Sequence, residues 1–368
     1  MRSCSGLIEE LIKNHVEDYR FLKEKIKATD ENGNRIFFLG IRNDALKLYY
    51  MGMRVFVLEI KDNQTFYSTS PSYVENDEEV AKKMSFDKME NHFQLICQSI
   101  EKYAKKEKIC QQAIVNGTNW NDDNWFYIDM EYEESAATSK RNFVFGRPDM
   151  IAVSQNTDKD GKHVVALVEL KVGNGSYGGG LDKTRESDYI KLKEDLYFQE
   201  CRNLKLGSGI VGHIVDYMRY LNYGGYDRLK EELIETIKDY KALGLLTDSN
   251  KIFHIDKADM FADVPEIYIV SYTCVPIDGY RDEVTSLKSM KRSFYDYLFG
   301  RSEYSLEKCL NKKQIDGFMK RKNDFKEFKC KEDYKFSFEQ KINNIDYNFH
   351  IVFFDPNVYS NNKWNCLL

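Results

Sequence analysis

Several common sequence features are missing from this 368-residue chain, and each absence removes a class of protein. The eight cysteines are scattered, without a Cys-x-x-Cys pair or regular spacing, so reduced thiols are expected instead of a zinc site or a disulfide framework. No window approaches the roughly 20 apolar residues that a membrane-spanning helix needs, and the first residues lack the apolar stretch of a signal peptide. Together these absences predict a cytoplasmic protein without a membrane partner.

A strong excess of charge is also missing. The formal net charge of −5 argues against unspecific binding of nucleic acid by the whole surface, but it leaves a local basic track open. Hydrophobic residues make up 42% of the chain and aromatic residues 14%, which is enough for a substantial core and excludes a disordered protein. The length predicts two or three structural units.

What the sequence does contain is organised around residues 142–173. Two apolar runs, residues 143–153 and 163–172, flank a polar segment, residues 155–162, that is rich in Asn, Asp and Gly. This composition is typical of two β-strands joined by a turn. The sequence therefore predicts a β-hairpin.

Charged residues interrupt both predicted strands. Asp149 lies in the first, and Glu169 and Lys171 lie in the second, where alternation places these two side chains on the same face. A carboxylate in such a strand is costly to bury unless a cation neutralises it. If pairing brings Asp149 near Glu169, the hairpin forms a divalent-metal site with a lysine beside it.

The residues Pro148-Asp149, followed by Glu169-Leu170-Lys171 at the end of an apolar strand, resemble the signature of the PD-(D/E)XK nuclease superfamily. Glu-x-Lys also occurs at Glu59–Lys61 and Glu327–Lys329, but neither copy follows a Pro-Asp strand. The resemblance covers roughly residues 87–275. It implies an α/β protein with a restriction-endonuclease-like core, a mixed β-sheet flanked by helices, and the order helix, strand, strand, strand, helix, strand agrees with it.

The same resemblance implies the chemistry. The expected activity is metal-dependent hydrolysis of phosphodiester bonds, with DNA as the favoured substrate, in restriction of foreign DNA, antiviral defence or repair. Mg²⁺, for which Mn²⁺ can substitute, is expected on Asp149, Glu169 and the carbonyl oxygen of Leu170. Lys171 is expected to position the attacking water and stabilise charge at the phosphorus.

A further acid is expected from the helix that precedes the first core strand. Glu107 is our choice, with Gln111 one turn later on the same face. A solvated charge run explains Glu107 equally well, and Glu131, in the strand predicted for residues 125–133, is the alternative acid.

One later helix carries a second resemblance. His213 and Tyr217 are one turn apart in the helix predicted for residues 208–221, a spacing similar to the Gln-x-x-x-Tyr element of recombination-type members, with His in place of Gln. The pair is predicted either to bind nucleic acid or to be a packed polar pair. The glycine-rich residues 173–180 lack the Lys-Ser/Thr ending of a phosphate-binding loop, and we expect a lid over the cleft there instead.

The two ends of the chain have a different character from its middle. Residues 1–84 are predicted to form an accessory module of a helix and a β-meander, residues 85–278 the nuclease core, and residues 279–368 a basic helical extension that ends in a strand added to the sheet edge. Between residues 288 and 331, thirteen Lys and Arg face six Asp and Glu. The predicted nucleic-acid contacts in this extension are Lys320, Arg321 and Lys322; its aromatic residues either stack on bases or form a core.

Other functions remain open from the sequence alone. A catalytically silent nucleic-acid-binding or scaffold protein with the same fold is one alternative, and an RNA nuclease is another. A homodimer is expected because cutting two strands needs two sites, and the amino-terminal module is a candidate docking surface for a protein partner.

Overall fold

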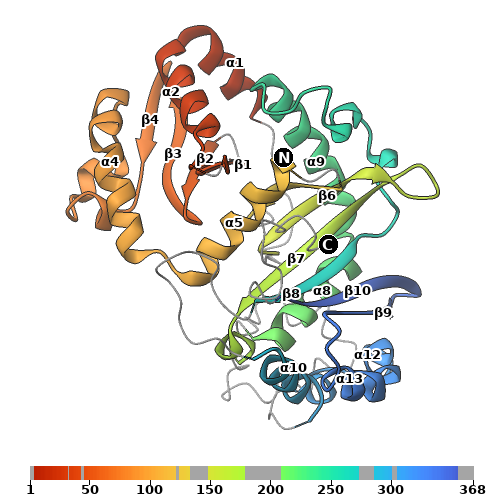
Figure 1. The fold of residues 1–368 in the computed structure, drawn as a ribbon. Helices are drawn as coiled ribbons and strands as arrows, with labels where there is room; N and C mark the ends of the chain where they lie inside the picture. Colours follow the sequence, from red (N-terminus) through yellow and green to blue (C-terminus); the bar gives the residue numbers. More distant parts are fainter. Residues whose placement is uncertain are drawn as a thin grey trace.

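The computed structural model describes residues 4–31, 33–42, 45–121, 124–132, 148–178, 209–272, 286–300 and 305–354. Two β-sheets organise the chain, and helices cover them (Figure 1). None of the described helices combines the length and the apolar composition that crossing a membrane requires. The structure describes five of the cysteines, and no disulfide joins them.

The amino-terminal module contains a four-stranded antiparallel sheet in the order β1-β2-β3-β4, so the predicted meander is confirmed. The initial helical segment is broken at His15 into two helices. The elements of this part of the chain are α1 (Ser5–Asn14), α2 (Val16–Lys27), β1 (Phe37–Arg42), β2 (Ala45–Tyr50), β3 (Met53–Lys61), β4 (Gln64–Ser68), α3 (Glu78–Lys82) and α4 (Phe86–Tyr103).

The second sheet has six strands in the order β5-β6-β7-β8-β10-β9. Strand β6 runs antiparallel to both β5 and β7, whereas β8 runs parallel to both β7 and β10. The described order of helix, three strands, helices and strand therefore agrees with the predicted one. Its elements are α5 (Lys106–Asn121), β5 (Trp125–Met130), β6 (Met150–Thr157), β7 (His163–Val172), α8 (Ile210–Asn222), α9 (Gly225–Ala242) and β8 (Glu266–Tyr272).

The predicted hairpin is present as β6 and β7. Met150 pairs with Val168, and the polar turn between the strands is closed by Asp158, whose side chain accepts hydrogen bonds from the N–H groups of Asp160 and Lys162. Strand β7 is buried almost throughout because it lies inside the sheet and is covered on both faces. Residues 143–147 of the first predicted strand lie outside the described residues.

The carboxy-terminal region differs from its prediction. Strand β10 was expected at the sheet edge, but it lies between β8 and an edge strand, β9, that the sequence analysis missed. The polar alternation of β9 fits its one solvent-facing side. The elements of this region are α10 (Leu287–Tyr295), α11 (Leu306–Cys309), α12 (Asp316–Lys320), α13 (Lys322–Phe328), β9 (Lys335–Ile342) and β10 (Ile345–Phe354).

Several aromatic and basic residues of this region are structural. Phe294 and Phe299 are buried and each packs against the buried ring of Phe325, so of the two alternatives left open for the aromatic residues, core packing applies to Phe294 and Phe299. Lys291, one of the thirteen basic residues, is also buried, and its ammonium donates to the carbonyl oxygens of Phe328, Lys331 and Asp333. The core of this region therefore includes a lysine of the basic segment as well as its aromatic rings.

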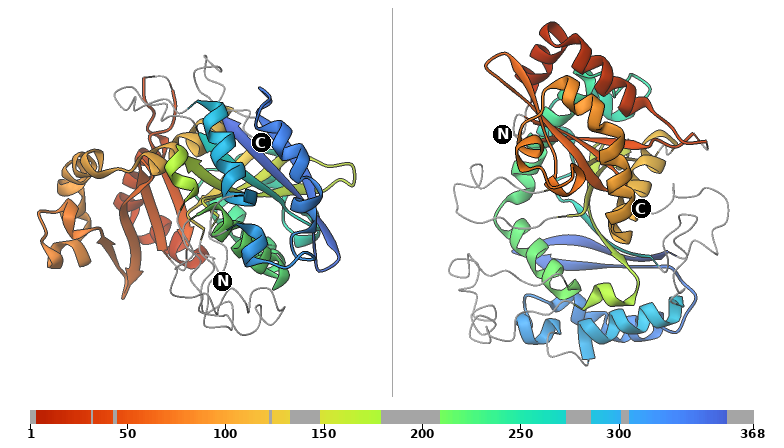
Figure 2. Two further views of the ribbon diagram at one scale, coloured as in Figure 1. Left: turned by 90° about the horizontal axis from the view of Figure 1, so that it is seen from below. Right: turned by 90° about the vertical axis from the view of Figure 1, so that its left-hand side faces the viewer.

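Helix α5 lies between the amino-terminal module and the second sheet (Figures 1 and 2). One side of the helix packs Ile109 and Ile114 onto the sheet in a core shared with Leu170. On the module side, the Gln112 side chain accepts from the N–H of Gly52 at 2.6 Å and donates to the carbonyl oxygen of Ile36 at 2.7 Å. The module is therefore attached to the helix that precedes the first core strand.

Replacement of Gly52 tests this attachment. Gly52 has a φ of +72°, and a Cβ atom there would lie 2.1 Å from the carbonyl oxygen of Lys108 in α5. Gly52→Ala should lower the free energy of unfolding by more than the roughly 1–2 kcal/mol that a left-handed residue alone costs. Denaturant unfolding measures the loss.

Gly161→Ala is the matched control, because Gly161 has a φ of +75° but nothing within 4 Å of the added Cβ. It carries the backbone penalty without the overlap. Equal losses for the two variants would contradict the close approach of the module to α5.

Candidate active site

The carboxylate of Glu169 is the centre of a buried polar cluster at the end of β7. The residue is 0% exposed and Lys171, on the same strand face, is 4% exposed. The Lys171 ammonium contacts Oε1 of Glu169 at 2.5 Å, and Nε2 of His213 lies 3.2 Å from the same oxygen. The Tyr217 hydroxyl donates to Oε2 at 2.6 Å. Both oxygens of the buried carboxylate therefore have partners from β7 and α8.

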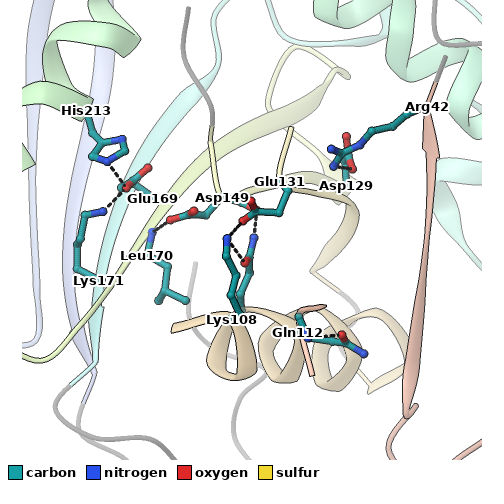
Figure 3. A network of polar contacts seen from close by, with 12 residues as sticks. Arg42, Lys108, Gln112, Asp129, Glu131, Asp149, Glu169, Leu170, Lys171 and His213 are labelled. Carbon is teal, nitrogen blue, oxygen red and sulfur yellow. Dashed lines mark hydrogen bonds and ion pairs between the residues drawn. The ribbon is translucent and has the colours of Figure 1, made fainter. Parts of the chain in front are cut away.

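Asp149 reaches this cluster from the start of β6. Its Oδ2 accepts a hydrogen bond from the N–H of Leu170 at 2.8 Å, which places the carboxylate beside the Glu169–Leu170 peptide (Figure 3). Because the N–H and C=O of a strand residue point to the same side, the Leu170 carbonyl faces the same edge as Asp149. The three residues of the signature, Asp149, Glu169 and Lys171, thus converge in the structure.

A second polar group holds Asp149 from the other side. The carbonyl oxygen of Asp149 accepts from the N–H of Glu131 at 2.8 Å and from the side chain of Gln111. Glu131 has a φ of +58° and forms an ion pair with Lys108 of α5. A left-handed non-glycine residue is uncommon and concentrates at functional sites. Lys108 escaped the sequence analysis because it lies in a charge run, where one side chain cannot be told from its neighbours.

The two acids have opposite pKa shifts. Burial and the nearby charge of Glu169 raise the pKa of Asp149 well above its usual value, and Lys171 only partly offsets this. Burial alone would raise the pKa of Glu169 too, but His213 and Lys171 outweigh it and lower that pKa. Asp149 is therefore the easier of the two carboxylates to protonate, because the charge of Glu169 opposes its ionisation.

Two further pKa shifts follow from the same cluster. Burial acts to lower the pKa of Lys171, but the charges of Glu169 and Asp149 raise it, so this ammonium stays protonated. Burial raises the pKa of Glu107, and this group also feels the charges of Lys171 and Glu169. The chosen acid of α5 is thus within electrostatic reach of the cluster.

The predicted nucleic-acid residues divide into two groups. His213 and Tyr217 hold Glu169, and Tyr217 is 0% exposed, so it positions the carboxylate instead of contacting nucleic acid directly. Lys320, Arg321 and Lys322 are each in a surface ion pair, with Asp316, Asp324 and Glu307 respectively. Such pairs are weak and open easily, so a role of these cations in binding nucleic acid stays a prediction.

The oxygen atoms of Asp149, Glu169 and Leu170 are of the kind that holds a divalent cation. Two carboxylates and a backbone carbonyl are oxygen ligands that Mg²⁺ prefers, and a cation between Asp149 and Glu169 would remove their mutual repulsion. The described residues contain no group of three or more His, Cys, Asp or Glu side chains arranged to hold a metal ion. The residues therefore fit Mg²⁺ in kind, with the remaining ligands left to the backbone, water and substrate.

A cavity of about 520 Å³ opens beside the cluster. Asp149, Glu131 and His213 line one side of it, and residues of the amino-terminal sheet line the other. Asp149 is partly exposed, whereas Glu169 is not. Of the two signature carboxylates, Asp149 is thus the one that lines the cavity.

Comparison of the chain with protein-family models, with curated proteins and with solved structures found no match in any of the three.

Breaking the buried ion pair should cost stability. Lys171→Met removes the ammonium paired with the buried charge of Glu169, and we expect a loss of about 3–5 kcal/mol in the free energy of unfolding, measured in chelator. The double variant Glu169→Gln/Lys171→Met also removes the unpaired charge of Glu169 and should recover part of the lost free energy of unfolding.

The exposed Glu59–Lys61 pair of β3 provides the control, because it has the same spacing with an ammonium-to-carboxylate distance of 3.0 Å. Lys61→Met should hardly change stability. If Lys171→Met were equally harmless, the buried pair would not have the energetic role assigned here.

Proposed function

We propose that this protein is a metal-dependent nuclease that hydrolyses phosphodiester bonds, with DNA as the favoured substrate. The observation that carries the proposal is the convergence of Asp149, Glu169 and Lys171 at the edge of a cavity. Two carboxylates and an ammonium at one point are more than a folded hairpin needs, because burying them opposes folding.

Each residue has a part that follows from its position. Asp149 and Glu169, with the Leu170 carbonyl, would hold Mg²⁺, which when bound neutralises charge on the phosphate and lowers the pKa of a bound water. Lys171 is held on Glu169 and stays protonated, so its ammonium can orient a water and stabilise negative charge at the phosphorus. His213 and Tyr217 keep the Glu169 carboxylate in one orientation.

Glu107 remains our choice for the additional acid. Glu131 is already engaged by Lys108, whereas Glu107 lies on the first turn of α5, near the charges of Lys171 and Glu169. An acid with a raised pKa can exchange a proton with the leaving oxygen or an outer water.

A catalytically silent nucleic-acid-binding protein with the same fold is the second candidate. It is favoured by the lack of a three-membered metal-ligating cluster among the described residues and by the engagement of both Glu169 oxygens. Calorimetric titration with Mg²⁺ and Mn²⁺ separates the two, since only the nuclease should bind the cation through Asp149 and lose binding in Asp149→Asn.

The activity test uses linear, circular and single-stranded DNA and RNA, each with Mg²⁺, Mn²⁺ or chelator. We expect cleavage that chelator abolishes and that Asp149→Asn and Glu169→Gln reduce by at least about 10²-fold. Glu59→Gln, in the exposed copy of the motif, is the control and should cleave at the wild-type rate.

The same assay ranks the two candidate acids. Glu107→Gln should slow cleavage more than Glu131→Gln if Glu107 completes the site. Cleavage that persists in chelator, or in purified Asp149→Asn protein, would remove the proposed function.

A further inference from the structure

The amino-terminal module forms one wall of the cavity beside the candidate active site. Lys47 and Tyr49 of β2 and Arg54 of β3 line this wall, with Arg42 at the end of β1. Tyr49 and Arg54 are directly paired across the two strands, and Lys47 is two residues from Tyr49, so their side chains share one sheet face. The module therefore presents a row of cations toward Asp149.

Arg42 is the member of this row whose position is most constrained. It is 6% exposed, and its guanidinium contacts Oδ1 of Asp129 in β5 at 2.7 Å (Figure 3). Its Nε has no hydrogen-bond partner within the described part of the chain. A buried donor without an acceptor is rare in folded proteins and needs an explanation. The Nε atom is enclosed, so a ligand in the cavity would respond to the charge of the guanidinium and not bond to this atom.

The other groups of the wall suit the same kind of ligand. Arg54 is exposed, and Ser70 and Tyr73 add hydroxyl groups to the lining. Arg, Lys, Ser and Tyr side chains are the usual partners of phosphate oxygens in nucleic-acid complexes. The acids Asp149 and Glu131 lie on the opposite side, so the cavity is cationic on the module side and acidic on the core side.

The size of the cavity limits the ligand. About 520 Å³ is within the usual range for small-molecule sites, roughly 300–1,000 Å³. This volume accommodates one or two nucleotides. A duplex, whose major groove alone is about 12 Å wide, does not enter it.

We propose that the amino-terminal module is part of the substrate site and binds a single nucleic-acid strand, with phosphates next to the scissile one contacting Arg42, Lys47 and Arg54. This assigns a function to a module that the sequence analysis treated as an accessory, and it rests on the proposed nuclease function. The core supplies the hydrolytic groups and the module supplies the phosphate track.

The test measures binding without cleavage. Fluorescence anisotropy of a labelled 20-nucleotide single strand is recorded in chelator at several salt concentrations for the full chain and for Lys47→Ala/Arg54→Ala. We expect affinity to fall about tenfold and the dependence of log Kd on log salt to become shallower by about 0.7 for each lost phosphate contact. Both single-stranded DNA and single-stranded RNA are used, and duplex DNA should bind more weakly than either one.

Lys13→Ala/Lys27→Ala is the matched control, because it removes the same charge from exposed positions of α1 and α2 in the same module. It should bind like the wild type. Thermal unfolding of each variant distinguishes a loss of affinity from a loss of folding. Arg54→Ala alone is included as a variant that changes the module less.

Two results would overturn the inference: wild-type binding by Lys47→Ala/Arg54→Ala, or an equal loss in Lys13→Ala/Lys27→Ala. A loss confined to Lys320→Ala/Arg321→Ala would move the track to the carboxy-terminal region and overturn it as well. The outcomes are separable from those of the activity test. If the wild type binds the strand through the module but does not cleave it, only the nuclease function is contradicted. If the wild type cleaves but Lys47→Ala/Arg54→Ala binds the strand as tightly as the wild type does, only the phosphate track is contradicted.

Discussion

The buried charge of Glu169 is the constraint on which the rest of the structure depends. An isolated carboxylate at 0% exposure is very costly, so the fold must bring cations and donors to it. Lys171 comes from the same strand, but His213 and Tyr217 come from α8 and require that helix to be docked on the sheet. The Glu59–Lys61 pair makes no such demand, because water solvates it.

A second buried ion pair, Arg42–Asp129, connects the two sheets. Arg42 ends a strand of the amino-terminal module and Asp129 lies in β5, and each is almost completely buried. Separating the module from the core would leave one of these two charges buried without its partner, which is strongly unfavourable. Tyr240 of α9 adds a further tie, donating to the carbonyl oxygens of Leu39 and Ile128. The cavity wall is thus held rigidly opposite Asp149.

The sequence predicted the parts of this arrangement that depend on local patterns. Strand alternation placed Glu169 and Lys171 on one face, and the Asp158 turn specified the hairpin that brings Asp149 to them. Helical spacing placed His213 and Tyr217 on one side of α8, and in the structure their shared contact is the carboxylate of Glu169. The roles of these residues in catalysis remain predictions.

What the sequence did not reveal depends on contacts between distant segments. Arg42 and Asp129 are 87 residues apart, and neither stands out locally, because an arginine at the end of a strand and an acid within one are both common. The strand order that inserts β10 between β8 and β9 is equally invisible, since both orders satisfy the same apolar alternation.

Composition and structure direct attention to different parts of the chain for a nucleic-acid contact. Composition counts cations along the chain, and by that count residues 288–331 dominate. In the structure Lys291 is buried in the core of that region, and Lys320, Arg321 and Lys322 face acids. A phosphate responds to the local potential, and Arg42, Lys47 and Arg54 together line the cavity. We therefore place the phosphate track at the three cations that line the cavity, and not along residues 288–331, where Lys291 is buried and Lys320, Arg321 and Lys322 pair with acids.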